Sequence, residues 1–162
     1  MKRFLAIFAV LVCVVTLCAC EYDKDGDKGY EPRGEYVLPT SDRAEQGSVP
    51  YAVAKLIEGG QVVRDYYEMT VDAIGAEEGY CIRTNGINVE IYRFKEDNEF
   101  FKKIKELGAY PIMDQEGNVL ATNRAVINGN LVMMIPTNTN ATLMDITAQN
   151  DKLAKRFEEL KL

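Results

Sequence analysis

A short Asn-Gly dipeptide limits the folds open to this chain more than any other feature of the sequence. Asn85-Gly86 stands between two runs rich in β-branched and aromatic residues, at 80–84 and 87–94. Asn and Gly both tolerate the positive φ angles of a two-residue β-turn, so the stretch predicts a β-hairpin. Large side chains occupy both alternating sets of positions in 87–94, which predicts a central strand of the sheet.

Further strands follow downstream, and each pair is again separated by turn-forming residues. Strands are predicted at 110–113 and 119–122 around Asp114-Gln115-Glu116-Gly117, and at 125–127 and 131–135 around Asn128-Gly129-Asn130. Consecutive strands joined by such short turns pair antiparallel. The sequence therefore predicts an antiparallel sheet built from Asn-Gly hairpins.

Three segments have the pattern of helices. One begins at Ser48 as N-cap, with Pro50 in its first turn, and ends at Glu58. A second covers 97–107, ends at Gly108, and places four apolar side chains inward: Phe100, Phe101, Ile104 and Leu107. The stretch 62–75 fits both strand alternation and helical spacing, and the helical interpretation is preferred.

The C-terminal helix has the most regular apolar pattern. Thr142 and Asp145 have the spacing of a capping box. The positions that repeat every three or four residues are Leu143, Ile146, Asn150, Leu153, Phe157 and Leu160. This seam is expected to cover the sheet of its own chain, so we expect a monomer, while a dimer through this helix stays open. The fold class is therefore α+β, with helices packed on one face of the sheet.

The N-terminus has the pattern of an export signal. Lys2 and Arg3 precede an apolar run at 4–17, which is shorter than the roughly 20 residues of a membrane-spanning helix. The run ends in Leu17-Cys18-Ala19-Cys20, which resembles the lipobox of bacterial lipoproteins. Cys18 stands where Ala, Ser or Thr is commoner. An uncleaved signal anchor and an ordinary secretory signal are the alternatives.

The resemblance implies that the chain is cut before Cys20 and anchored in a membrane by diacylglycerol on that residue, outside the cytoplasm. It does not distinguish an inner from an outer membrane. We divide the chain into a signal peptide (1–19), a lipidated cysteine with an acidic tether (20–40) and one globular α+β domain (41–162). That domain, with its helices and Asn-Gly hairpins, resembles small extracytoplasmic lipoprotein domains. This resemblance implies no particular activity.

The tether carries one candidate cation site. Carboxylates alternate in Asp23-Lys24-Asp25-Gly26-Asp27-Lys28-Gly29, as in a calcium-binding loop. However, Lys28 stands where an EF-hand loop has Gly, and Gly34 stands where it has its bidentate Glu. We therefore interpret the segment as a solvated linker and predict no metal site and no cofactor.

Composition removes several classes of chemistry. The chain has no His, which excludes Ser-His, Cys-His and His-metal mechanisms. Its sequence pI near 4.8 argues against nucleic-acid binding. After cleavage, Cys81 is the one thiol besides Cys20, and its apolar strand predicts a buried packing role. Acidic residues gather at Glu77-Glu78 and in 114–116, both in predicted turns.

Tyrosine is the residue type that best suggests a binding surface, because it joins apolar area to a polar tip. The candidates are Tyr66, Tyr67, Tyr80, Tyr92 and Tyr110. The function that the sequence favours is a non-catalytic binding or protein-interaction module of the cell envelope, acting on an envelope protein or a small solute. The alternative is a small extracytoplasmic enzyme that uses carboxylates alone, and this enzyme requires paired acids in a concave site.

Overall fold

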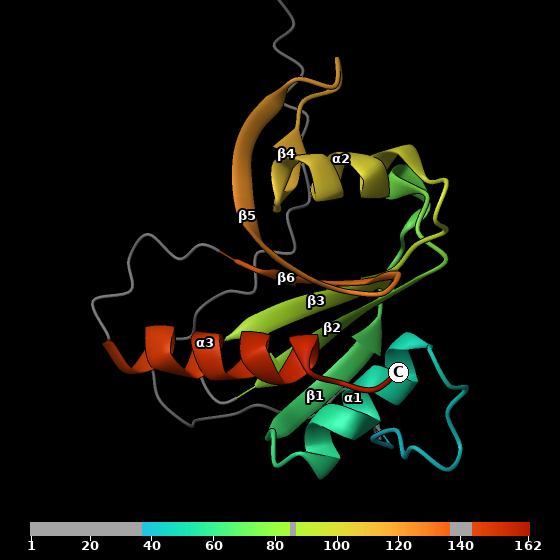
Figure 1. Ribbon diagram of the computed structural model, residues 1–162, viewed down its shortest axis with the longest axis vertical. Helices are drawn as coiled ribbons and strands as arrows, with labels where there is room; N and C mark the ends of the chain where they lie inside the picture. The colour runs from blue at the N-terminus through green and yellow to red at the C-terminus, as the bar shows by residue number, and fades with distance from the viewer. Residues whose placement is uncertain (1–36, 85–86, 137–143) are drawn as a thin grey trace, which may run out of the picture. The chain divides into compact units, whose positions relative to one another are not determined.

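The strands form one six-stranded antiparallel sheet with three helices around it in the computed structural model (Figure 1). The structure describes residues 37–84, 87–136 and 144–162, without the side chains of 144–146, and all of these residues belong to one compact unit, Glu31–Leu162. The sheet order is β1-β2-β3-β6-β5-β4. The strands are β1 (Val63–Glu68), β2 (Glu78–Thr84), β3 (Asn88–Arg93), β4 (Ala109–Met113), β5 (Val119–Asn128) and β6 (Leu131–Ile135). The predicted α+β class is confirmed.

The predicted hairpins are present, with one change. β2 pairs with β3 across 85–86, which lie outside the described residues, and β3 lies between β2 and β6 as expected of a central strand. β5 pairs with β6 across a turn in which Gly129 has a φ of 60°. The two strands predicted within 119–127 are a single strand, β5, which pairs with β4 along its first half and with β6 along its second.

The first helix has its predicted bounds, whereas the second ends as predicted but begins at Glu99, two residues later than the predicted 97. α1 (Val49–Glu58) has Ser48 as N-cap, whose hydroxyl accepts a hydrogen bond from the Tyr51 N–H. α2 (Glu99–Leu107) has Asn98 as N-cap and ends at Gly108, which adopts a φ of 63°. One detail of the prediction is wrong, because the last residue of α2, Leu107, is 45% exposed. Leu107 lies in the final turn of α2, beyond the part of the sheet that this helix covers.

The preference for a helix at 62–75 is wrong. The segment forms β1, and a single 3₁₀ turn follows at Asp72–Ile74. A register shift between Val63 and Asp65 marks an irregularity in the pairing of β1 with β2. Such a bulge disturbs the strict alternation that identifies a strand in a sequence. Pairing with β2 decides the conformation here.

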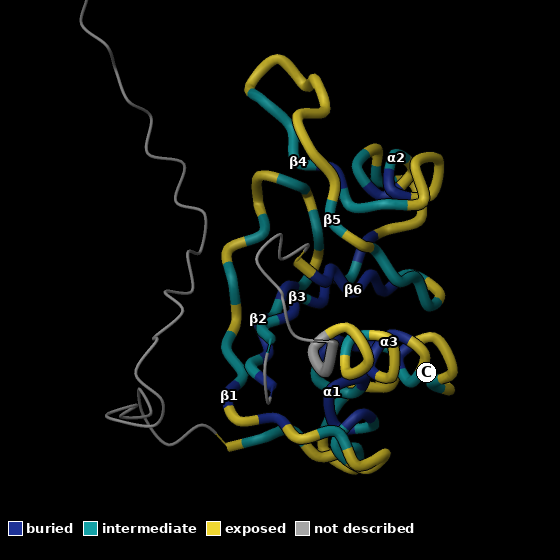
Figure 2. Tube along the Cα trace, turned by 90° about the vertical axis from the view of Figure 1, so that its left-hand side faces the viewer, coloured by how far each residue is buried: buried dark blue, intermediate teal, exposed yellow. Residues whose placement is uncertain are grey.

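The expectation that the helices pack on one face of the sheet is also wrong, because alternate residues of the central strands feed two separate cores. On one side, Val89 and Ile91 of β3 join the cluster of α1 and the third helix, α3 (Met144–Glu158). On the other side, Tyr92 and Phe94 join the cluster of α2. Successive side chains of a strand point to opposite faces, so α2 covers the face that α1 and α3 leave. Figure 2 shows the deepest burial along β3 and β6.

α3 packs on the sheet of its own chain, as predicted. Leu153 and Phe157 are buried in the core shared with α1. At its end, the Asn128 side-chain amide donates to the carbonyls of Phe157 (2.8 Å) and Leu160 (3.0 Å). Asn150 is partly buried, and its Oδ1 has no hydrogen-bond partner in the described part of the chain. The predicted capping residue Thr142 lies outside the described residues.

Candidate functional site

The five candidate tyrosines do not gather on one surface. Tyr66 and Tyr80 stack in parallel, with ring centroids 4.6 Å apart, against the core of α1 and α3. Tyr92 and Tyr110 stack at 5.6 Å in the core of α2 on the opposite face. Tyr67 follows Tyr66 along β1, and alternation therefore directs its side chain to the other face.

Burial controls the ionisation of these phenols. It is the largest cause that raises the pKa of Tyr110 to about 12, and it raises the pKa values of Tyr66, Tyr80 and Tyr92 as well. The Tyr92 hydroxyl donates a hydrogen bond to Glu90. Since burial disfavours a phenolate, these four tyrosines are neutral at physiological pH and act as packing groups and hydrogen-bond partners.

The acidic pair near β2 has a structural role. Glu78 is the first residue of β2, where a turn was predicted. Its carboxylate lies 2.7 Å from the Arg93 guanidinium and accepts a hydrogen bond from the Val49 N–H at the start of α1 (2.8 Å). Glu77 lies 3.5 Å from the Nε of Arg93. These contacts join the beginning of α1 to β2 and β3.

The second acidic cluster lies in the β4–β5 turn. The Asp114 carboxylate accepts hydrogen bonds from the backbone N–H groups of Glu116 (2.9 Å) and Asn118 (2.8 Å). Hydrogen bonds from Asn118 hold the pKa of Asp114 below its ordinary value. Asp114 therefore orders the turn as a charged carboxylate.

Cys81 is buried, as its place in an apolar strand predicted, and it forms no disulfide. The described residues contain no group of three or more His, Cys, Asp or Glu side chains that could hold a metal ion. None of the helices in the described ranges is long and apolar enough to cross a membrane. Cys20 and residues 21–36 of the acidic tether lie outside these ranges.

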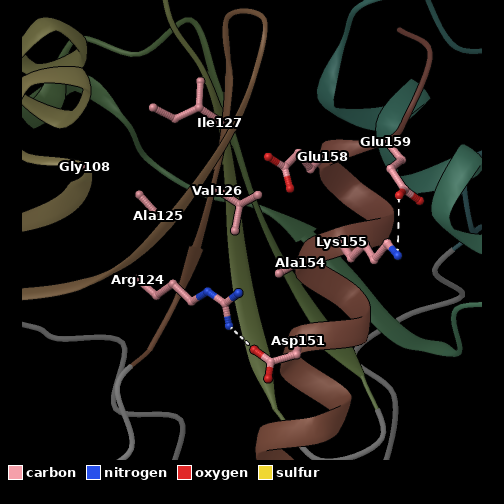
Figure 3. A pocket seen from close by; sticks show the side chains of 10 residues that line it. All are labelled: Gly108, Arg124, Ala125, Val126, Ile127, Asp151, Ala154, Lys155, Glu158 and Glu159. Atoms are coloured by element: carbon pink, nitrogen blue, oxygen red, sulfur yellow. Dashed lines mark hydrogen bonds and ion pairs between the residues drawn. The ribbon is translucent and has the colours of Figure 1, made fainter.

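A hollow of about 620 Å³ lies between β5 and α3 (Figure 3). Residues 124–127 of β5 line one side of the hollow, and residues of α3, most of them charged, form the opposite wall. The lining residues are Gly108, Arg124, Ala125, Val126, Ile127, Asp151, Ala154, Lys155, Glu158 and Glu159. We call this hollow the β5–α3 groove.

Ion pairs hold most of the charged groups of the groove. Arg124 pairs with Asp151, and Lys155 lies 3.8 Å from Glu159. Figure 3 shows the Glu158 side chain extending from α3 toward β5. Glu158 is exposed and forms no ion pair among the described residues. The groove therefore has one carboxylate that no cation neutralises.

The backbone of β5 gives the groove its second property. The Asn130 carbonyl accepts a hydrogen bond from the Phe94 N–H, so even-numbered backbone groups of β6 face β3 and odd-numbered ones face β5. Leu131, Met133 and Ile135 lie opposite Asn128, Val126 and Arg124. The backbone groups of Ala125 and Ile127 therefore point away from β6, toward the groove.

These backbone groups have no strand beside them. β4 pairs with β5 only as far as Ala109 opposite Arg124, and Gly108 then turns away into α2. Because Arg124 faces β6, Ala109–Arg124 is a non-hydrogen-bonded pair, and the next position of the ladder places Gly108 opposite Ala125. Beyond Gly108, no strand of the described ranges pairs with β5 at Ile127 on this side. β5 therefore presents a short unpaired edge to the groove.

Sequence reasoning did not identify this groove, because it divided β5 into two strands. The available signal was the apolar run 125–127, whose alternate side chains serve the two cores: Val126 the core of α1 and α3, Ala125 and Ile127 the core of α2. In the sequence, the charged residues of α3 that form the wall have the pattern of an ordinary solvent-exposed helix face. Only the fold brings α3 beside the unpaired part of β5.

Comparison of the chain with models of protein families, with curated proteins and with solved structures finds no match.

Proposed function

We propose that this chain is a bacterial lipoprotein, anchored outside the cytoplasm by diacylglycerol on Cys20, which acts as a non-catalytic binding module of the cell envelope. The anchor is supported by the basic start, the apolar run and the tetrapeptide Leu17-Cys18-Ala19-Cys20. Residues 21–40 then serve as a hydrophilic tether between the membrane and the domain.

The β5–α3 groove is the observation that supports the binding role. It combines an open hollow with unpaired backbone groups and the unneutralised Glu158 carboxylate. The bound molecule is an envelope protein or a small solute. The domain holds it near the membrane without transforming it.

Metabolic labelling tests the anchor. The full chain with a C-terminal tag is expressed in bacteria fed an alkyne fatty acid, together with Cys20→Ala and the matched control Cys18→Ala. We expect label and membrane association for the unmodified chain and for Cys18→Ala, and loss of label for Cys20→Ala. Equal labelling of all three, or an unmodified chain without label, would refute lipidation at Cys20.

Site-specific crosslinking in intact cells tests the binding role. A photoreactive residue replaces Lys155 in the groove or, as a control, Glu106, which is exposed on α2 and does not line the groove. We expect one discrete adduct from position 155 and none from position 106. The same adducts from both positions, or none from either, would contradict binding through the groove.

A further inference from the structure

We propose that the β5–α3 groove binds a short extended peptide that adds a strand to β5 at Ala125 and Ile127. This inference rests on the proposed binding function and names the chemical class of the ligand. An unpaired strand edge presents N–H donors and C=O acceptors at every second residue, about 7 Å apart. An extended peptide has the same spacing of complementary groups, whereas a compact solute does not.

The other edges of the sheet carry features that oppose such pairing. Pro111 lies in the middle of the outer strand β4, and it pairs with Thr122 at a position whose backbone nitrogen points outward. Proline has no N–H to offer a new strand. At the opposite edge, β1 has an irregular register at Arg64, and Asp65 is buried. Bulges and inward charged residues are known protections of sheet edges.

The short edge at Ala125 and Ile127 has neither protection. Its two side chains are small or apolar and pack toward α2, and they leave the backbone edge accessible from the groove. No proline, charged residue or register shift interrupts the run 125–128. Since edges that must stay unpaired are protected elsewhere in this sheet, this edge is the one suited to receive a strand.

The groove also determines what the peptide carries. An added strand lies between β5 and the wall of α3, where Glu158 extends toward β5 (Figure 3). A lysine or arginine of the peptide would meet this carboxylate, whereas an acidic residue would be repelled by it. The volume of about 620 Å³ accommodates a few extended residues. The expected ligand is therefore a short, extended peptide with a basic side chain.

Selection from a peptide library tests the proposal. The full chain, purified in detergent, is used to select from random hexapeptides with blocked ends, and the best peptide is resynthesised with N-methyl groups at alternate positions. We expect enrichment of Lys and Arg, and N-methylation of one register to weaken binding about fivefold to tenfold per lost hydrogen bond, with no effect in the other register. Hydrogen exchange at the Ala125 and Ile127 amides should slow when the peptide is bound.

Variants of the protein locate the interaction. Ala125→Pro removes an outward N–H that β6 does not use, and it should weaken binding about fivefold to tenfold. Glu158→Lys should shift the selected residues from basic to acidic, whereas Glu106→Lys on α2 changes the net charge equally and should leave the selection unchanged. Should Ala125→Pro fail to fold, the N-methylated peptides still test the backbone contacts on the unmodified protein.

Three outcomes would overturn the proposal: no peptide enriched over a selection without protein, equal binding by both N-methylated registers, or a groove occupied by a second copy, seen as a dimer that Ala125→Pro dissociates. None of these outcomes depends on the lipid. Labelling at Cys20 can therefore succeed while peptide binding fails, and the failure of each proposal is recognised separately.

Discussion

The two faces of the sheet are stabilised by different side chains. The face under α1 and α3 is largely aliphatic, with Val53, Leu56 and Leu153 packed against β3 and β6 and one phenylalanine, Phe157. The face under α2 is aromatic: Phe94 stacks on Phe101 at 5.4 Å. A long sheet built from the same strands can thus carry two independent cores, and each core positions its own helices.

The largest test of this comparison removes one phenylalanine from each core. Phe101→Ala and Phe157→Ala each delete a fully buried ring, and each should cost about 3–5 kcal/mol of unfolding free energy. Phe101 should cost about 1 kcal/mol more, because it also loses its stack on Phe94. Urea unfolding of the full chain measures both values. Leu107→Ala, at an exposed site, should change stability by less than about 1 kcal/mol, and equal losses at all three sites would contradict two ordered cores.

The next test concerns how α3 is held on the aliphatic face. Asn128→Ala removes the amide that binds the last carbonyls of α3, and it should cost about 1–3 kcal/mol. Asn128→Asp should cost more, because a carboxylate cannot donate and is repelled by the negative end of the helix. Chemical denaturation ranks the two variants. An aspartate that is tolerated better than the alanine would show that the amide does not cap α3.

A smaller effect should separate the caps of α1 and α2. Ser48 accepts one hydrogen bond, from the Tyr51 N–H, so Ser48→Ala should cost about 1 kcal/mol. Asn98 accepts from the Phe101 N–H and also donates to the carbonyls of Ile74 and Gly75. Asn98→Ala should therefore cost about 1–2 kcal/mol.

An aspartate variant separates the two roles of the Asn98 cap. Asn98→Asp should retain the cap but lose the bonds to the 3₁₀ turn. Thermal melts of the three cap variants measure the differences. Full stability of Asn98→Asp would show that the bonds to the 3₁₀ turn contribute nothing.

The last test concerns alkaline stability, where the effect is confined to a pH range far above the physiological one. The pKa of Tyr110 is raised to about 12 in the folded chain, against about 10 when unfolded, so the folded state holds this proton more tightly. Its contribution to stability is complete below pH 10 and is lost as the pH rises through 12. Tyr110→Phe should flatten the decline of the urea midpoint between pH 10 and 12. A slope unchanged by Tyr110→Phe would contradict burial of this phenol.

The helices and hairpins were predictable where a local signal decides the structure. Ser48, Gly108 and the Asn-Gly turns act on their immediate neighbours, so the sequence alone locates them. β1 was misassigned because its pairing with β2, and not its own pattern, determines the conformation. The large side chains on both faces of β3 correctly predicted a central strand, but not which helix would cover which face.

The candidate site was harder to predict because it forms where the second half of β5 has no neighbouring strand on one side. The groove exists since β4 ends its pairing at Arg124 while β5 continues to Asn128. The residue at which two strands stop pairing is decided by contacts between segments that are distant in the sequence. The tyrosines, by contrast, were chosen for their chemistry, and the fold places four of them in two separate stacks.

The Asn128 side chain also has a consequence for the order of folding. It joins the end of the β5–β6 hairpin to the last turn of α3, across 29 to 32 residues of sequence. Hairpins form within microseconds from neighbouring residues, whereas contacts of this separation must wait for a large loop to close. The last turn of α3 should therefore dock on the sheet after the hairpin has formed, and slowing the turn at Gly129 should delay the docking of a helix that lies far along the chain.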